Sequence, residues 1–327
     1  MKLTSLYTPA LKDTWSGRGD TPPELRFFQT VACLNLDNEA LPQGENSAWA
    51  LLGFCSDEGV LRNLGRPGAN EGPTALRQQL AKLPNHSARP LLDLGDIHCL
   101  EGELDVAQQS LGRLLSIAHI KDYRSLVFGG GHEVAWAHYL GLHEAYRDKR
   151  LGIINFDAHF DLRKLNDPMK ANSGTPFYQI AQDRQAHGSP FDYYCIGIQQ
   201  TANTADLFET AESLAVAYMS AEDIHQNSMA WQIALLEDFL SQQEHIYLSI
   251  CLDVFAESHA PGVSAPQALG LTPWQALPLL KYIVQSGKVI AIDVAELSPV
   301  LDKSSKTARL AANIVAELLN EDGRADG

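Results

Sequence analysis

The sequence predicts one three-layer α/β domain, a mainly parallel sheet flanked by helices. Short apolar runs alternate with longer helical patterns along the 327-residue chain. Strands separated by helices of this length pair in parallel through right-handed crossovers. The runs LGIINF (Leu151–Phe156) and IYLSICL (Ile246–Leu252) are almost wholly apolar, as expected of strands covered by helices on both faces. We expect a single domain over residues 1–327, although this pattern leaves residues 1–45 and Asn320–Gly327 unassigned to its core.

The strands of this sheet are predicted from apolar runs of four to eight residues. They are, in order, Trp49–Phe54, Leu91–Leu94, Ser125–Phe128, Leu151–Phe156, Tyr193–Ile198, Val216–Met219, His245–Leu252 and Lys288–Val294. Apolar residues at helical spacing predict the helices between them. These are Pro73–Leu83, Glu103–Ile120, His132–Arg147, Ser228–Ser241, Thr272–Gln285 and Ser304–Leu319. Ser220 and Asp223 resemble a capping box just upstream of the helix Ser228–Ser241.

Composition narrows the functional class. The chain has 25 Lys and Arg against 40 Asp and Glu, a formal net charge of −15, which argues against binding to a nucleic-acid backbone. The N-terminus lacks the apolar core of a signal peptide, and no run reaches the roughly 18 apolar residues of a membrane span. Five scattered cysteines form neither a disulfide framework nor a CxxC pattern. These features predict a cytoplasmic protein with reduced thiols.

Candidate chemistry follows four of the predicted strands. In an open parallel sheet, ligands bind beyond the carboxyl ends of the strands. The segments at those ends are Gly129-Gly130-Gly131-His132-Glu133, Asp157-Ala158-His159-Phe160-Asp161, Cys251-Leu252-Asp253, and Asp293 through Glu296. We therefore expect the His, Asp, Cys and Glu side chains of these segments to meet at one edge of the sheet.

The segment Asp157-x-His159-x-Asp161 is the sharpest of these signals. Alternate residues of an extended backbone share a face, so the three side chains can converge on one point. Two carboxylates and an imidazole would need a cation between them. The alternative is a polar strand exit with an Asp that caps a helix. His132 follows three glycines, which permit a tight turn and a close approach of the backbone to a neighbour.

The segments GGGHE, DAHFD, SICLDVF with PGVSAP, and DVAELSP, in this order, resemble the arginase/agmatinase/formimidoylglutamase (ureohydrolase) family over roughly residues 50–320. The resemblance implies an arginase-like fold and a hydrolase that acts on C–N bonds in linear amidines with two Mn²⁺ ions. The positions that match metal ligands are His132, Asp157, His159, Asp161 and Asp253. Asp157 matches a carboxylate that bridges the two ions. Glu296 matches a carboxylate that faces the cationic end of the substrate.

Cys251 departs from the family pattern, which has Asp at this position. Manganese prefers oxygen ligands to a soft thiolate. Cys251 is therefore a candidate ligand that leaves occupancy of the second metal position open. The alternative is a small apolar filler in a buried strand.

The expected chemistry follows from charge. A water that bridges two divalent cations gives hydroxide at neutral pH, which would attack the amidine carbon. Asp161 would hydrogen-bond the nucleophile and pass a proton to the leaving nitrogen. Glu296 would orient the cationic formimidoyl group.

The substrate expectation rests on the stretch Ser173–Tyr178, SGTPFY, which lacks the His of guanidine-hydrolysing members and resembles the formimidoylglutamase members. We therefore expect hydrolysis of N-formimidoyl-L-glutamate to L-glutamate and formamide, a step of histidine degradation. Arg62 and Arg163 are candidates to bind the substrate carboxylates, because the guanidinium fork suits them. Asn63 offers a donor and an acceptor to a polar substrate. The alternative for both arginines is an ordinary ion pair.

Two other functions stay open. One is another amidine or guanidine hydrolase of this family, agmatinase-like or guanidinobutyrase-like. The other is a metal-binding regulatory protein that has lost turnover through Cys251. The resemblance also implies a homo-oligomer, whereas no nucleic acid or membrane partner is expected.

Overall fold

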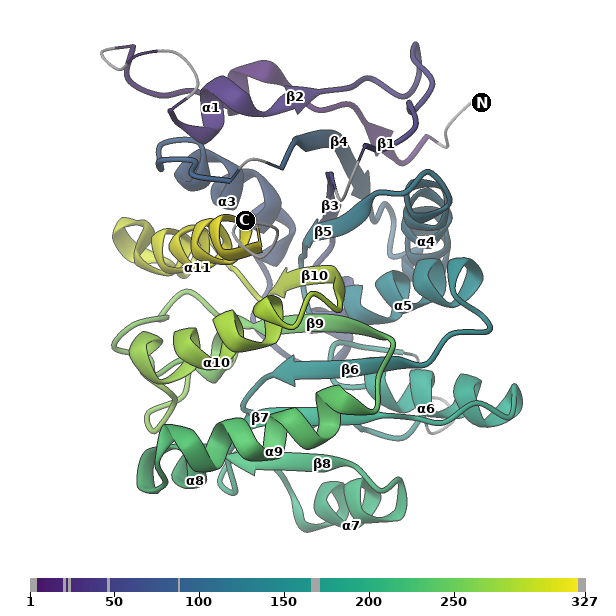
Figure 1. Cartoon of the computed structure of the whole chain (residues 1–327), viewed down its shortest axis with the longest axis vertical. Helices are drawn as coiled ribbons and strands as arrows, with labels where there is room; N and C mark the ends of the chain where they lie inside the picture. Colours follow the sequence, from purple (N-terminus) through teal and green to yellow (C-terminus); the bar gives the residue numbers. More distant parts are fainter. Residues whose placement is uncertain are drawn as a thin grey trace.

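The computed structural model describes residues 5–19, 22, 25–45, 48–87, 89–165 and 171–322, so the extreme ends of the chain lie outside it. The described residues form one ten-stranded sheet with strand order β1-β4-β3-β5-β10-β9-β6-β7-β8, and β2 also pairs with β4. The pairing of β1 with β4 is antiparallel and the others are parallel. Helices cover both faces, with α8–α11 on one side and α4–α7 on the other (Figure 1). The predicted single-domain, three-layer α/β fold is confirmed.

All the predicted strands are present. They are β3–β10, whereas β1 and β2 were not predicted. The bounds of the ten strands are β1 Tyr7–Thr8, β2 Ala32–Cys33, β3 Trp49–Cys55, β4 Leu91–His98, β5 Arg124–Phe128, β6 Leu151–Phe156, β7 Tyr193–Ile198, β8 Ala217–Ser220, β9 His245–Cys251 and β10 Val289–Ala295. Strand β4 runs four residues beyond the predicted end at Leu94. Gly95, with a φ of +95°, accommodates the irregularity there, so the strand continues where the sequence indicates a turn.

The helices α1–α11 span Phe27–Thr30, Glu58–Arg62, Gly72–Leu80, Leu104–Ile120, Val134–Ala145, Pro176–Ala186, Ala205–Ser213, Ala221–Gln226, Met229–Ser241, Pro273–Gln285 and Lys306–Asp322. The six predicted helices are present as α3, α4, α5, α9, α10 and α11, whereas α1, α2, α6, α7 and α8 were not predicted. The capping box of Ser220 and Asp223 begins the short helix α8, while α9 has its own N-cap, Ser228.

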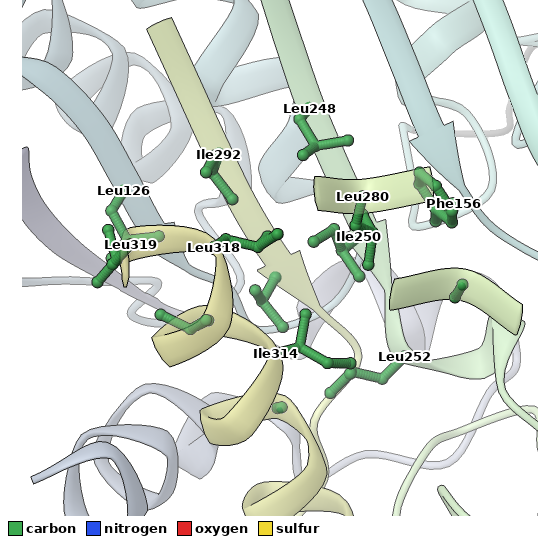
Figure 2. Close-up of a cluster of buried hydrophobic side chains, with 14 of the residues drawn as sticks. Leu126, Phe156, Leu248, Ile250, Leu252, Leu280, Ile292, Ile314, Leu318 and Leu319 are labelled. Carbon is green, nitrogen blue, oxygen red and sulfur yellow. The ribbon is translucent and has the colours of Figure 1, made fainter. Parts of the chain in front are cut away.

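The largest apolar cluster lies between the sheet and helices α10 and α11. Figure 2 shows Ile314 and Leu318 of α11 and Leu280 of α10 beside Ile292 of β10 and Ile250 of β9. All five side chains are at most 4% exposed. Burial of each contributes about 1.5–3 kcal/mol, so this face holds the central strands rigidly in place.

Both ends of the chain contribute to the packing. Trp15 and Phe27, from the N-terminal segment, are buried in the largest apolar cluster. The last helix does not stop at Leu319 but continues to Asp322, which is 1% exposed. The Asp322 carboxylate accepts a hydrogen bond from Trp49 Nε1 at 3.1 Å and pairs with Arg89 at 2.8 Å, and these contacts explain the longer helix.

No helix in the described part of the chain is long and apolar enough to cross a membrane. The strands β5, β10, β9 and β6 are consecutive neighbours in the centre of the sheet. Because they are parallel, their carboxyl ends lie together, and these are the strand ends that carry the candidate residues.

Candidate metal centre

The four central strand ends meet at a cavity of about 430 Å³. Strand β5 leads into His132, β6 into Asp157, His159 and Asp161, β9 into Cys251 and Asp253, and β10 into Glu296. All of these except Asp157 line the cavity, and the carboxylate of Asp157 lies beneath it, in contact with His132. Asp157 is fully buried. The structure thus brings together every predicted metal-ligand position.

The glycine run before His132 is required by a close backbone contact. A Cβ on Gly130 would lie 1.7 Å from the carbonyl oxygen of Ser56, which is backbone and cannot easily move. Gly131 donates its N–H to that same carbonyl at 3.1 Å, and Glu296 donates its N–H to the Gly130 carbonyl at 2.8 Å. The turn after β5 is therefore fixed from both sides, which fixes the position of His132.

Two groups of ligand atoms share one carboxylate. His132, Asp157 and Cys251 form one group, and Asp157, His159 and Asp253 form the other, each with its ligand atoms within 4.8 Å of one another. Asp157 Oδ2 lies 2.9 Å from His132 Nδ1, and Asp157 Oδ1 lies 3.4 Å from His159 Nδ1. Asp253 Oδ2 lies 3.1 Å from His159 Nδ1. Two cations that share Asp157 would fit this arrangement.

The Nδ1 atom of His132 tests that fit. It is buried and lies 2.9 Å from carboxylate oxygens of both Asp157 and Asp161, yet no hydrogen bond of good geometry satisfies it. A buried nitrogen between two carboxylates, without a satisfied hydrogen bond, is suited to bind a cation. His, Asp and a thiol are all established ligands of divalent metals.

Asp161 and Glu296 both adopt the left-handed backbone conformation, with φ of 50° and 71°. This conformation is uncommon for residues other than glycine, and such strain concentrates at functional sites. The expectation that Asp157, His159 and Asp161 converge through an extended backbone is wrong in its geometry. The chain bends after β6, and the left-handed turn at Asp161 brings its carboxylate back to His132.

Burial and mutual repulsion shift the pKa values of these groups strongly. Burial raises the pKa of Asp253 to about 6, with Asp157 adding to the effect. Burial, together with the carboxylates of Glu133 and Asp253, raises the pKa of Glu296 to about 8. Burial, together with the carboxylates of Asp157 and Asp253, raises the pKa of the Cys251 thiol well above its ordinary value. Cations between these groups would relieve the repulsion that keeps them protonated.

The pKa values of the two imidazoles are also raised, although burial acts on them in the opposite direction. Burial alone would lower the pKa of His132, but Asp157 and Asp161 raise it well above the ordinary value. His159 behaves in the same way beside Asp253 and Asp157. Protons on the imidazoles therefore occupy the positions that cations would otherwise take.

A buried polar chain behind His132 was not predicted. His132 Nε2 lies 2.9 Å from Ser249 Oγ, which donates to Asp293 Oδ1 at 2.6 Å. Asp293 also contacts His138 Nδ1 at 2.9 Å and accepts a hydrogen bond from the hydroxyl of Tyr247. Such partners fix the orientation of a ligating imidazole. The sequence does contain the signal, because Ser249 alternates with Cys251 and so shares its face of β9, whereas Asp253 lies in the turn that follows β9.

The three residues predicted to bind the substrate differ in whether they reach the cavity. Asn63 and Arg163 line the cavity. Asn63 Nδ2 donates to Ser173 Oγ at 3.1 Å, and the Arg163 N–H donates to the Gly174 carbonyl at 2.9 Å, so the SGTPF stretch positions both. Arg62 does not line the cavity.

The guanidinium of Arg62 is engaged elsewhere. It pairs with Glu58 at 2.8 Å and donates to the carbonyls of Gly102 and Ala171 at 2.8 and 3.2 Å. The expectation that Arg62 binds substrate carboxylates is therefore corrected in favour of the ordinary ion pair. Arg66, four residues further along, lines the cavity and was missed.

The chain is similar to known proteins over nearly its whole length. A model of the arginase family matches residues 47–320. A formimidoylglutamase from Legionella pneumophila (strain Lens) is 52% identical and covers 97% of this chain and 98% of its own. A formimidoylglutamase from Aeromonas salmonicida (strain A449) is 43% identical and covers 93% of this chain and 96% of its own.

Solved structures agree in fold. The formimidoylglutamase of Bacillus subtilis superposes with a TM-score of 0.81 at 23% identity, covering 94% of this chain and 95% of that one. A Trypanosoma cruzi formiminoglutamase with Mn²⁺ gives a TM-score of 0.78 at 24% identity, covering 88% and 98%. The matched family model and the near full-length relatives lead to one conclusion: the chain belongs to the arginase family.

Proposed function

We propose that this protein hydrolyses N-formimidoyl-L-glutamate to L-glutamate and formamide, with two Mn²⁺ ions at the strand-end centre. One observation carries the proposal. A buried carboxylate, Asp157, is shared by two groups of ligand atoms beneath a cavity of about 430 Å³. The curated relatives at 52% and 43% identity are formimidoylglutamases, which supports this substrate over other amidines and guanidines.

The residues that would hold the ions follow from the two groups. One ion would take His132, Asp157, Asp161 and Cys251, and the other would take Asp157, His159 and Asp253. When bound, the ions would supply an activated water at neutral pH and would polarise the amidine. Cys251 would have to lose its proton to take part, which burial opposes in the absence of a cation.

The catalytic roles are proposed from position. Asp161 lines the cavity, and its left-handed turn directs the carboxylate toward His132. It would accept a proton from the water and deliver it to the leaving nitrogen. Glu296 lines the same cavity, and one of its oxygens accepts the His132 N–H at 2.9 Å. Its other oxygen would pair with the cationic formimidoyl group.

The glutamate end of the substrate carries two carboxylates. Arg163 is the cavity-lining guanidinium that follows directly from the catalytic segment, and Asn63 lies opposite it across Gly174. A Cβ on Gly174 would lie 2.9 Å from Arg163 Cδ and 3.3 Å from Asn63 Nδ2. These two side chains would bind carboxylate oxygens by charge-assisted and amide hydrogen bonds. Arg66 is a further cation at the same cavity.

The test uses protein stripped of metal with a chelator and then resupplied with Mn²⁺. Release of glutamate and formamide would be measured from N-formimidoyl-L-glutamate, with arginine, agmatine and 4-guanidinobutyrate in parallel. We expect manganese-dependent turnover of N-formimidoyl-L-glutamate alone. Turnover of a guanidine instead would favour an agmatinase-like or guanidinobutyrase-like enzyme. No turnover of any substrate, with Mn²⁺ bound, would favour the regulatory protein.

A variant tests substrate recognition separately. Arg163→Ala should raise KM by roughly 10-fold or more, since loss of one charge-assisted hydrogen bond costs about 1.5–3 kcal/mol. Lys164→Ala is the matched control, because Lys164 is an exposed neighbour that does not line the cavity. Equal KM values for the two variants would remove Arg163 from the proposed binding site.

The assembly and compartment are also proposed. A hollow of about 1030 Å³ includes the exposed apolar side chains of Tyr218 and Leu269, which supports a homo-oligomer because such surface is typical of interfaces. Light scattering on the purified protein would measure the mass directly. Five free cysteines, one of them at the metal centre, support a reducing compartment such as the cytoplasm.

A further inference from the structure

A second cluster of metal-ligand residues lies on the outer helices, away from the cavity. Helices α5 and α6 pack side by side on one face of the sheet (Figure 1). His143 comes from the last turn of α5, Asp183 from the last turns of α6, and His187 from the position directly after α6. Their ligand atoms all lie within 4.8 Å of one another, and none of the three lines the substrate cavity.

The arrangement repeats that of the active centre. There, the Nδ1 atoms of two imidazoles face the shared carboxylate of Asp157. Here, His143 Nδ1 lies 4.0 Å from Asp183 Oδ2, and His187 Nδ1 lies 3.5 Å from Asp183 Oδ1. Nitrogen and oxygen ligands bound to one zinc ion at about 2 Å lie roughly 3.3 Å apart. The observed separations therefore need to close by less than about 1 Å.

The carboxylate of Asp183 is already held in place by a hydrogen bond. The Tyr139 hydroxyl donates to Asp183 Oδ2 at 2.6 Å and also lies 3.2 Å from His143 Nδ1. The Arg184 guanidinium stacks over the Tyr139 ring at 5.3 Å and is buried there. An outer hydrogen bond of this kind orients a ligating carboxylate.

The imidazoles are suited to bind a metal. The side chain of His187 is 54% exposed, and its Nδ1 lies 2.8 Å from the backbone carbonyl of Asp183, a contact that it would leave on rotating toward an ion. The side chain of His143 is 16% exposed and is fixed by packing. Two imidazoles and one carboxylate suit Zn²⁺, Cu²⁺ or Ni²⁺ better than Mn²⁺.

We infer that His143, Asp183 and His187 form a separate binding site for one Zn²⁺ or a similar divalent transition-metal ion. The ion would link the C-terminal end of α5 to that of α6. The opposite ends of these two helices adjoin the active centre, because His132 lies two residues before α5 and Ser173 lies three residues before α6. Helix α6 spans 11 residues, roughly 16 Å, so the two metal sites lie about one helix length apart.

The experiment measures metal content and does not depend on the proposed activity. Manganese-loaded protein would be dialysed against increasing Zn²⁺, and both metals would be counted per chain. We expect wild type to bind one Zn²⁺ more than His187→Ala, with the manganese content equal in the two proteins. His225→Ala is the matched control, since His225 is an exposed histidine outside every ligand cluster of the described residues. It should behave like wild type.

Two further readouts keep the test decisive. Asp183→Asn should also lose the additional Zn²⁺, and Zn²⁺ should raise the Tm of wild type but not of His187→Ala. With Cu²⁺, the spin-resonance spectrum of wild type minus that of His187→Ala should show coupling to imidazole nitrogen. Equal Zn²⁺ content in wild type, His187→Ala and Asp183→Asn would overturn the inference. Because His187 is largely exposed, its removal leaves the fold intact, and a negative result cannot be assigned to unfolding.

Discussion

The ionisation of Glu296 predicts how the stability of the metal-free protein depends on pH. The folded protein raises the pKa of this carboxyl from 4.5 to about 8, through burial and the neighbouring carboxylates. An acid with a raised pKa stabilises the folded state fully below its unfolded pKa, and this contribution is lost as pH rises toward the folded pKa. Between pH 4.5 and pH 8 the loss amounts to about 4 kcal/mol, at 1.36 kcal/mol per unit of pKa.

The comparison of wild type with Glu296→Gln isolates this effect. Gln retains an oxygen that can accept the His132 N–H, the contact made at 2.9 Å in the wild type, but it cannot ionise. Urea unfolding of both metal-free proteins would be followed from pH 5 to pH 8. Wild type should lose about 4 kcal/mol more than the variant over the full range. Glu133→Gln should remove a smaller share, about 3 kcal/mol, because the pKa of Glu133 is raised to about 7.

The pH dependence of stability would also be measured with Mn²⁺ bound. Bound cations favour the ionised carboxylates, so Mn²⁺ should flatten the decline in wild type. Parallel pH profiles for metal-free wild type and Glu296→Gln would refute the reasoning, because they would show that Glu296 is ionised in the folded state at neutral pH. The infrared band of protonated carboxyls, weaker in the variant than in wild type at the same pH, would check the protonation state of Glu296 directly.

Three further predictions concern single positions. Gly130→Ala should lower stability by about 1–3 kcal/mol and weaken metal binding, because its Cβ would meet the Ser56 carbonyl. Gly19→Ala, with open space around it, should change neither stability nor metal binding. Thermal unfolding and metal titration of both variants would measure these effects. Asp322→Ala should cost about 1–3 kcal/mol in urea unfolding, because it removes the buried carboxylate that accepts the Trp49 Nε1–H. Glu317→Ala in the same helix removes a half-exposed ion pair and should cost less than about 1 kcal/mol. Cys251→Ala should weaken binding of one of two Mn²⁺ ions and Cys251→Asp should strengthen it, as calorimetric titration would show; equal affinities would exclude Cys251 as a ligand.

The succession of strands and helices along the chain follows from the sequence with little ambiguity. Apolar runs and helical spacing predict the central strands, and right-handed crossovers leave few ways to connect them. The ligand positions could be predicted for the same reason. His132, Asp157, Asp253 and Glu296 each lie within a few residues of a strand end, and adjacent parallel strands necessarily bring their carboxyl ends together. Local sequence therefore determined which residues meet at the candidate metal centre.

Contacts between residues far apart in the sequence decided the features that the sequence did not predict. Arg62 and Arg66 are equally plausible in sequence, yet Arg62 is held by carbonyls 40 and 109 residues away, and only Arg66 reaches the cavity. The end of the last helix depends on Asp322, whose partner Trp49 lies 273 residues earlier. Local pattern cannot report such contacts, because they exist only once the elements have packed.

The left-handed turns at Asp161 and Glu296 likewise have no decisive signature in the sequence, since Asp adopts that conformation more often than most residues but still uncommonly, and Glu rarely does. The surrounding packed strands impose it, at a cost of about 1–3 kcal/mol for each residue. The sequence alone determined which side chains arrive at the site. The tertiary structure decided how they point, because the direction of a side chain depends on backbone strain that only the completed fold can hold.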